Sequence, residues 1–166
     1  MSGSNRIPDH MQWMGSLVVN LQSLEFALRG FLYNDEKQWK NGDGPDLLNN
    51  IQQGQELEEN AFTNYDPLGT LIDTYNKKVQ RRDPGLEVDP GIARIRDALA
   101  HGRIAGLSPS QNEPLRLVKY DKPANGRVRV TDFHILTKGW FDEKSSLVTT
   151  NIQKVVCAIA LFRSAR

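Results

Sequence analysis

The residues best suited to chemistry lie in one short string, Arg96-Asp97-Ala98-Leu99-Ala100-His101. An arginine is a permanent cation whose forked donors match the geometry of a phosphate group. A histidine accepts and donates protons near neutral pH, which suits general acid–base catalysis. Together these residue types can cleave RNA without a metal, because the RNA 2′-hydroxyl is its own nucleophile. Such a reaction needs only proton transfer and stabilisation of charge on the phosphate.

The spacing of the three polar residues decides which of them can cooperate on a helix. Asp97 and His101 lie four residues apart, about 40° around the axis, so the carboxylate can hold the imidazole. Arg96 and His101 lie about 140° apart and roughly 7.5 Å along the axis. The arginine must therefore reach round the helix, or a second subunit must complete the site. Spacing alone also allows a structural interpretation, in which Asp97 pairs with a histidine that the helix dipole favours.

Other chemistries have little support in the sequence. His10 and His134 have no histidine or cysteine at metal-ligand spacing. The single cysteine, Cys157, excludes an internal disulfide, and we expect it to be a small buried residue rather than a nucleophile. No glycine-rich phosphate loop is present. We therefore expect no metal site and no cofactor.

The candidate residues lie on the best-delimited element of the chain, a helix predicted over 90–101. Asp89 is suited to the N-cap, Pro90 to the first position and Gly102 to the stop. Its buried face is expected to comprise Ile92, Ile95 and Leu99.

Apolar residues at helical spacing predict three further helices, near 10–33, 66–82 and 140–163. Glu25 and Arg29 are four residues apart in the first and are expected to pair. In the last, the stripe comprises Val148, Ile152, Val155, Val156, Ile159 and Phe162. The second ends in four bases that complement its dipole or contact phosphate, namely Lys77, Lys78, Arg81 and Arg82.

A β-hairpin is predicted near 115–136, with its turn at Pro123-Ala124-Asn125-Gly126. Arg127 and Arg129 alternate with valines on its second strand. Residues 34–64 break the helical pattern, and a short helix or an irregular excursion both fit them.

Composition indicates one globular domain, spanning 1–166, with 39% hydrophobic residues. No run of about 18 continuous apolar residues predicts a membrane span, and no secretory signal is evident at the start. We therefore expect a cytoplasmic protein. The net charge is only +1, but residues 77–104 carry seven bases against four acids. This distribution can attract an anion, or it can be an ordinary solvated surface.

The string from Arg96 to His101 resembles the R-x4–6-H signature of the HEPN superfamily (higher eukaryotes and prokaryotes nucleotide-binding), and Asp97 fits the polar residue that often follows the arginine. The context is also similar, with a long first helix carrying Leu-Glu-Phe-Ala-Leu-Arg, a basic second helix and a closing amphipathic helix. The resemblance in the order of helices covers residues 10–163, which is nearly all of the chain. It implies a mostly α fold, an antiparallel helical bundle with one hairpin inserted before the last helix.

The resemblance also implies an activity. Many HEPN members are metal-independent endoribonucleases that work as homodimers, as toxins or in phage defence. Carried over, Arg96 would hold the scissile phosphate, His101 would be the general acid or base, and Asp97 would orient His101 or place the RNA. Cleavage would leave a 2′,3′-cyclic phosphate. From the basic clusters we expect RNA contacts by Lys78, Arg82, Arg103, Arg127 and Arg129.

Two features keep alternatives open. Some family toxins continue the motif as His-x-Tyr, where this chain has His101-Gly102-Arg103, so regulation by modification of that tyrosine is not expected. Many relatives bind a protein or a nucleotide without catalysis. A non-catalytic binding module is therefore the competing hypothesis. Under the ribonuclease hypothesis, the expected partner protein is an antitoxin or a defence protein.

Overall fold

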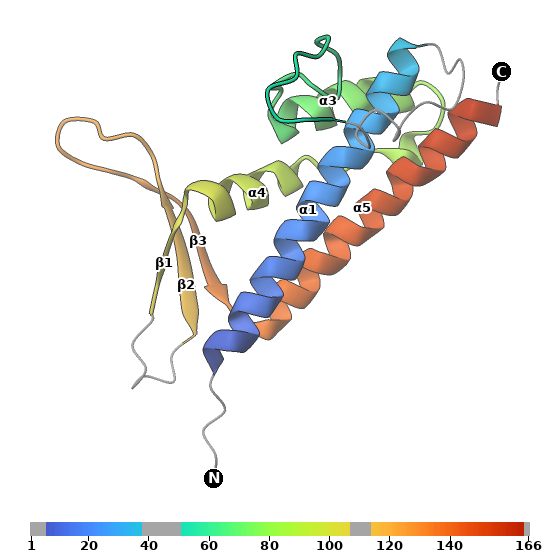
Figure 1. Cartoon of the computed structure of the whole chain (residues 1–166). Helices are drawn as coiled ribbons and strands as arrows, with labels where there is room; N and C mark the ends of the chain where they lie inside the picture. Colours follow the sequence, from blue (N-terminus) through green and yellow to red (C-terminus); the bar gives the residue numbers. More distant parts are fainter. Residues whose placement is uncertain (1–5, 38–50, 107–113, 165–166) are drawn as a thin grey trace. The chain divides into compact units, whose positions relative to one another are not determined.

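The computed structural model describes residues 6–37, 51–106 and 114–164. This part of the chain is mostly helical, with one small antiparallel sheet (Figure 1). The elements are α1 (Arg6–Glu36), α3 (Leu68–Val79), the short 3-10 helix η1 (Pro84–Leu86), α4 (Gly91–His101), β1 (Arg103–Ala105), β2 (Leu115–Tyr120), β3 (Val130–Leu136) and α5 (Lys138–Ser164). The predicted helices and the hairpin before the last helix are confirmed.

Several helices begin or end at residues other than those predicted from the sequence. α3 begins after Pro67, which is extended, and it ends at Val79, so Arg81 and Arg82 lie beyond the helix. The three-residue strand β1 was not predicted, because a strand so short leaves no periodic signal. Within 34–64, residues 51–59 form no helix, while 38–50 lie outside the described residues.

The chain divides into two compact units, and the boundary falls inside both long helices. One unit comprises Met1–Leu21 and Gly91–Val148, and the other comprises Gln22–Pro90 and Thr149–Arg166. We call them the sheet unit and the helical unit.

In the sheet unit, the strands follow the order β1-β2-β3 and all pair antiparallel. The hairpin turns at Asn125 (φ 52°) and Gly126 (φ 72°), as a two-residue turn with two left-handed positions requires. Leu117 and Leu136 on the inner face of the sheet are buried. α4 buries Ile92, Ile95 and Ala98; the predicted Leu99 is only half-buried.

In the helical unit, aromatic rings join α1, α3 and α5. Phe31 meets Tyr75 and Phe162 edge-on, with ring centroids 4.8 and 4.9 Å apart. The buried residues of α3 are Leu68, Leu71, Ile72, Tyr75 and Val79. The Tyr75 hydroxyl donates to the Leu86 carbonyl (3.0 Å), and burial raises the pKa of this hydroxyl above its usual value.

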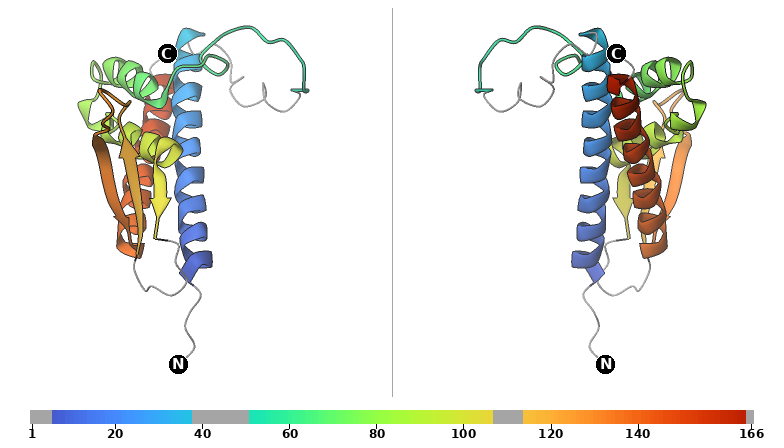
Figure 2. Two further views of the ribbon diagram at one scale, coloured as in Figure 1. Left: turned by 90° about the vertical axis from the view of Figure 1, so that its left-hand side faces the viewer. Right: turned by 90° about the vertical axis from the view of Figure 1, so that its right-hand side faces the viewer.

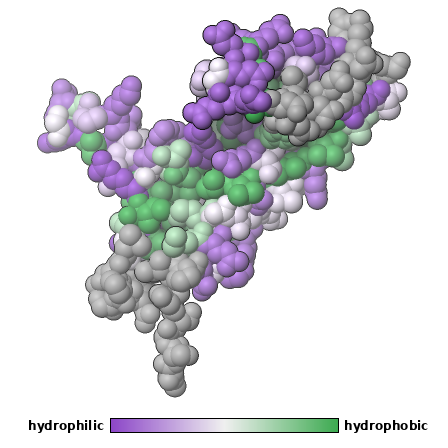
Figure 3. All heavy atoms as spheres, viewed as in Figure 1, coloured by the Kyte–Doolittle hydropathy of each residue, from purple (hydrophilic) through white to green (hydrophobic). Residues whose placement is uncertain are grey.

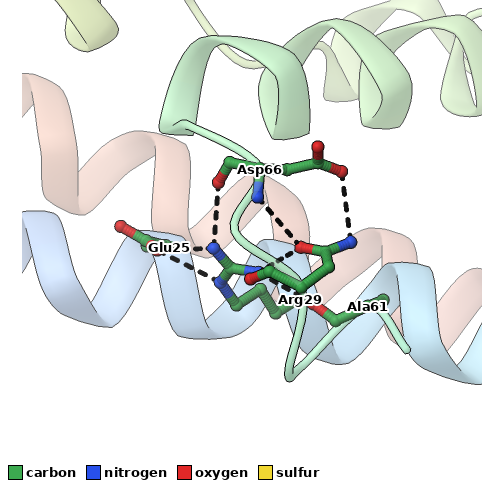
Figure 4. A network of polar contacts seen from close by, with 5 residues as sticks. Glu25, Arg29, Ala61 and Asp66 are labelled. Atoms are coloured by element: carbon green, nitrogen blue, oxygen red, sulfur yellow. Dashed lines mark hydrogen bonds and ion pairs between the residues drawn. The ribbon is translucent and has the colours of Figure 1, made fainter. Parts of the chain in front are cut away.

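Arg29 provides the polar anchor of the helical unit (Figure 4). It pairs with Glu25 as predicted, Nη2 lying 2.9 Å from Oε1. Its guanidinium also donates to the carbonyls of Ala61, Asn64 and Asp66 and to the Asn64 side chain. One side chain on α1 therefore holds the irregular segment that leads into α3.

Within each unit, the segments of α1 and α5 run in the same direction, side by side (Figure 2). In the sheet unit their beginnings meet, where Trp13 contacts Phe141 with ring centroids 5.9 Å apart. In the helical unit their later turns meet, through Phe31 and Phe162. The antiparallel arrangement predicted for the bundle is therefore wrong for this pair. The reason is that β3 returns the chain to the start of α1, where the Leu136 carbonyl lies 3.0 Å from His10 Nε2.

The outer side of α5 corrects two predictions. Val156 and Cys157 are exposed, although both were expected to be buried. Because a helical turn holds 3.6 residues, the two positions between the buried Val155 and Ala158 point away from the core.

By length and composition, α5 is the one helix among the described residues that can cross a membrane, because it contains an 18-residue window with a mean hydropathy of 1.3. This is weak evidence, since the core helix of a soluble protein passes the same test. A continuous apolar run is absent from the sequence of α5, because serines, threonines and Asn151 interrupt its apolar residues. A hydropathy average over a window tolerates these interruptions. The cytoplasmic location stays a prediction.

Candidate functional site

The end of α4 places the candidate residues, and Gly102 determines that end. Its backbone N–H donates to the Ala98 carbonyl at 2.7 Å. A Cβ at position 102 would lie 2.4 Å from the Ala98 carbonyl oxygen and 2.6 Å from Leu117 Cδ1. Glycine therefore allows the chain to leave α4 against β2 and enter β1 at once. His101 and Arg103 lie on either side of this junction.

Asp97 and His101 lie together on α4, as their spacing predicts. His101 Nε2 is 3.6 Å from Asp97 Oδ1. The histidine side chain is 65% exposed, so a ligand can reach the imidazole from solvent. At this distance the contact is an ion pair when the imidazole is protonated, rather than a close hydrogen bond.

Lys119 is the residue that sequence reasoning missed. Its Nζ binds the second carboxylate oxygen of Asp97, reaching from β2 to α4. The hydrogen bond to Asp97 raises the pKa of the Lys119 ammonium. One sequence signal was available: Lys119 alternates with Leu115 and Leu117, so it shares the inner face of the hairpin.

A second ion pair crosses between α4 and the sheet nearby. Arg94 Nη2 lies 3.2 Å from Oδ1 of Asp132 on β3. Lys119 and Asp132 are direct cross-strand partners, so the two pairs are adjacent. Charges of both signs therefore alternate across this contact, and Asp97 is held against the sheet.

Arg96 differs from its neighbours. Its side chain is exposed, and no hydrogen bond or ion pair joins it to another described residue. It does not meet His101, since the two lie on opposite flanks of the buried face of α4. The structure therefore brings Asp97, His101 and Lys119 together and leaves Arg96 apart.

The predicted RNA contacts fall into two groups. Arg103 follows His101 closely on β1, and its guanidinium lies over the Tyr120 ring, 5.5 Å from the centroid. Arg127 and Arg129 line a hollow of about 370 Å³ in the hairpin arm, together with Asp121, Lys122, Ala124 and Val128. These three arginines belong to the sheet unit, as do the residues of α4.

Lys78 and Arg82 belong to the helical unit, and both have partners there. The Lys78 ammonium lies 2.5 Å from Asp35 Oδ2. The Arg82 guanidinium lies over the Phe162 ring, 4.2 Å from its centroid. The structure gives each a local role and does not join either to the α4 cluster.

The other histidines also have local packing. His10 packs on Trp13, and His134 packs on Trp140, with ring centroids 5.0 and 5.5 Å apart. Among the described residues, no group of three or more histidine, cysteine, aspartate or glutamate side chains can hold a metal ion.

Comparison with known proteins found no match among family models, curated proteins or solved structures. The likeness to HEPN proteins therefore rests on the residues of the motif and on the order of the helices. What the α4 cluster can do must be argued from its own chemistry: an exposed imidazole beside a fixed carboxylate, with an exposed guanidinium on the same helix.

Proposed function

We propose that the chain is a HEPN-like, metal-independent endoribonuclease. One observation carries the proposal: on α4, His101 and Arg96 are exposed while Asp97 is held by Lys119. If the cluster had only a structural role, we would expect Arg96, Asp97 and His101 all to make contacts within the fold. Here the proton-transfer group and one permanent cation stay available to a ligand.

The proposed reaction uses the RNA 2′-hydroxyl as nucleophile. A base removes its proton, the oxygen bonds to the adjacent phosphorus, and the bond to the 5′-oxygen breaks. The leaving oxygen takes a proton, and the products are a 2′,3′-cyclic phosphate and a 5′-hydroxyl end. His101 serves as the base or the acid, and Arg96 binds the phosphate as its charge develops.

Asp97 is a positioning residue in this scheme. Its contact with His101 favours one orientation of the imidazole, and Lys119 fixes the carboxylate that does this. Both carboxylate oxygens of Asp97 have partners, His101 at Oδ1 and Lys119 at Oδ2, so we assign the removal of the 2′-hydroxyl proton to His101 rather than to Asp97.

The separation of Arg96 from His101 favours a homodimer, in which Arg96 of one subunit and His101 of the other line one cleft. Exposed apolar residues are available for such a contact. Met11 and Val19 on α1 are 70% and 59% exposed. Figure 3 shows that apolar surface is also visible on one face of the described chain. A cytoplasmic toxin or defence role, with an antitoxin or defence protein as partner, belongs to the same proposal.

The test is cleavage of synthetic and total RNA in EDTA. We expect wild type to cut, and His101→Ala and Arg96→Ala each to lose at least about 100-fold in rate, because general acid–base and phosphate contacts are typically worth that much. Arg163→Ala, an exposed arginine near the end of α5, is the matched control and should cut normally. Cleavage that requires Mg²⁺, or full activity in both α4 variants, would contradict the proposal.

A second candidate is a non-catalytic binding module, and the Asp97–Lys119 pair favours it. This pair joins α4 to β2 and has a structural role of its own. Under this alternative, wild type cuts no RNA, and Asp97→Asn lowers the melting temperature without abolishing any reaction. A folded wild-type dimer that is inactive on all RNAs would support it.

A further inference from the structure

The outer face of the three-stranded sheet has an unusual composition. The strand register places these residues on that face, opposite to Leu117 and Leu136: Arg103, Ala105, Arg116, Val118, Tyr120, Phe133 and Ile135. A bulge at the far end sets Val130 opposite Tyr120. We call this set the outer face.

Large apolar side chains on the outer face are open to solvent. Phe133 is 53% exposed, Ile135 47% and Tyr120 39%. An antiparallel sheet with one buried face normally carries polar residues on the other. Aromatic and branched residues on both faces therefore indicate that a ligand covers the outer face in the working protein.

The charges on this face identify the kind of ligand. Among the described residues that the register places there, the only charged ones are Arg103 and Arg116. The acidic residue of β3, Asp132, points to the inner face, where it pairs with Arg94. A surface of exposed aromatic rings beside arginines, with no carboxylate, complements an anion that has planar groups.

The arrangement of the rings narrows the choice to a single strand of nucleic acid. Val118 is directly opposite Phe133, so Tyr120 is the diagonal neighbour of Phe133 across the two strands. The Arg103 guanidinium lies over the Tyr120 ring. Sequence-tolerant single-strand binders combine aromatic stacking positions with cations that follow the backbone. A duplex cannot use such positions, because its bases are already stacked on each other.

We propose that the outer face binds single-stranded RNA, with successive bases stacked on Tyr120 and Phe133 and a phosphate contacted by Arg103. The inference deepens the proposed nuclease function, since it names the form of the substrate. Arg103 lies two residues after His101, at most about 7 Å along the chain. An RNA strand on the outer face therefore crosses the β1 edge close to the imidazole.

The test measures binding separately from cleavage. Fluorescence anisotropy with a fluorescein-labelled single-stranded RNA of mixed sequence, in EDTA, gives the Kd of the full-length protein. The His101→Ala background prevents cleavage during the titration. We expect Phe133→Ala and Tyr120→Ala each to weaken binding about ten-fold, the usual effect of removing one stacking partner. Phe133→Trp should retain binding, which a merely structural role does not predict.

Two controls make the result specific. Val156→Ala removes an exposed apolar side chain from α5 and should leave the Kd unchanged. The same RNA annealed to its complement should bind more weakly than the single strand. Circular dichroism should show that Phe133→Ala and Tyr120→Ala are folded, as expected for exposed positions.

Three results would overturn the inference. The first is the absence of any affinity of the wild type for single-stranded RNA. The second is binding by both aromatic variants that is as tight as binding by the His101→Ala background. The third is a change from dimer to monomer in the aromatic variants, measured by light scattering, with an unchanged Kd. That result would assign the outer face to a second copy of the chain. These results leave the nuclease assay untouched, whereas binding on the outer face with no cleavage by wild type would refute the nuclease alone.

Discussion

Two arginines on α-helices show how differently this chain uses the same residue. Arg29 on α1 is 12% exposed, and its guanidinium contacts the Glu25 carboxylate, three backbone carbonyls and the Asn64 amide (Figure 4). Arg96 on α4 is exposed and has no hydrogen bond or ion pair within the described residues. The N–H donors of Arg29 are bonded to groups within the fold. Those of Arg96 have no partner among the described residues and can bind a ligand.

The difference separates stability from binding. The acceptors around Arg29 are backbone groups of an irregular segment, so they need a donor that helix or sheet would otherwise supply. Removing Arg29 leaves several of them unpaired at once. Removing Arg96 leaves no group unpaired among the residues that the structure describes, so a cost to activity without a cost to stability would indicate a ligand contact.

The largest effect on stability is expected for Arg29→Met. It keeps much of the apolar stem but leaves the Glu25 carboxylate and the carbonyls of Ala61, Asn64 and Asp66 without their donor. We expect a loss of about 3 kcal/mol in the free energy of unfolding, as for breaking a buried ion pair. Urea denaturation gives this value. Arg96→Ala is the matched control, with an expected change of about 0.5 kcal/mol or less.

Equal losses of stability in the two variants would show that Arg29 and Arg96 do not differ in their structural roles. A large loss in Arg96→Ala in particular would show that Arg96 has a structural role, and it would favour the non-catalytic alternative.

How far the sequence predicts these regions depends on the distance of each contact along the chain. The Glu25–Arg29 and Asp97–His101 pairs follow from helical spacing and were predicted. The contacts of Arg29 with residues 61–66 and of Lys119 with Asp97 were not. They depend on how separate elements pack, which one-dimensional periodicity does not encode.

The same limit explains the errors. The apolar stripe predicted for α5 includes Val156, which is exposed, and Cys157 was expected to be buried as a small apolar residue but is exposed as well. The direction of α1 relative to α5 depends on where β3 returns the chain. By contrast, the ends of α4 were predicted well, because glycine and proline act locally.

Gly102→Ala should have the next largest effect, because it alters the junction that presents His101. The added Cβ would meet the Ala98 carbonyl and Leu117 Cδ1 at less than contact distance. We expect a loss of about 2 kcal/mol in the free energy of unfolding, typical of a forced backbone shift. RNA cleavage should also fall, since His101 and Arg103 move with the junction.

The control for this substitution is Gly15→Ala on α1, where an added Cβ meets nothing within 4 Å. Alanine is favoured over glycine within a helix by up to about 1 kcal/mol, so this variant should be as stable as wild type or more stable. A harmless Gly102→Ala would show that the α4–β1 junction can relax without moving the site.

The smallest effect on stability is expected for Lys119→Met. This variant tests whether Asp97 mainly stabilises the fold, as Arg29 does, or mainly positions His101. The hydrogen bond to Asp97 raises the pKa of Lys119 in the folded state. The pair therefore stabilises the fold fully below the unfolded-state pKa, about 10.4, and this contribution is lost as pH rises through the folded-state pKa. Lys119→Met should lose about 0.5 kcal/mol at pH 8, because the Asp97 side chain is 42% exposed and the pair is partly screened.

The measurement is the free energy of unfolding of wild type and Lys119→Met from pH 8 to 11, with Lys122→Met as an exposed lysine control. Tyr75 also destabilises the fold at alkaline pH, because its hydroxyl ionises more readily in the unfolded chain. This effect is common to both proteins, so the test uses the difference between their free energies of unfolding at each pH. The two curves should converge as pH rises. A gap of several kcal/mol that persists at pH 11 would place Asp97 and Lys119 with Arg29, as part of the structural framework. A small difference in the free energy of unfolding that disappears as pH rises, together with slower RNA cleavage, would show that Asp97 and Lys119 position the catalytic imidazole of His101.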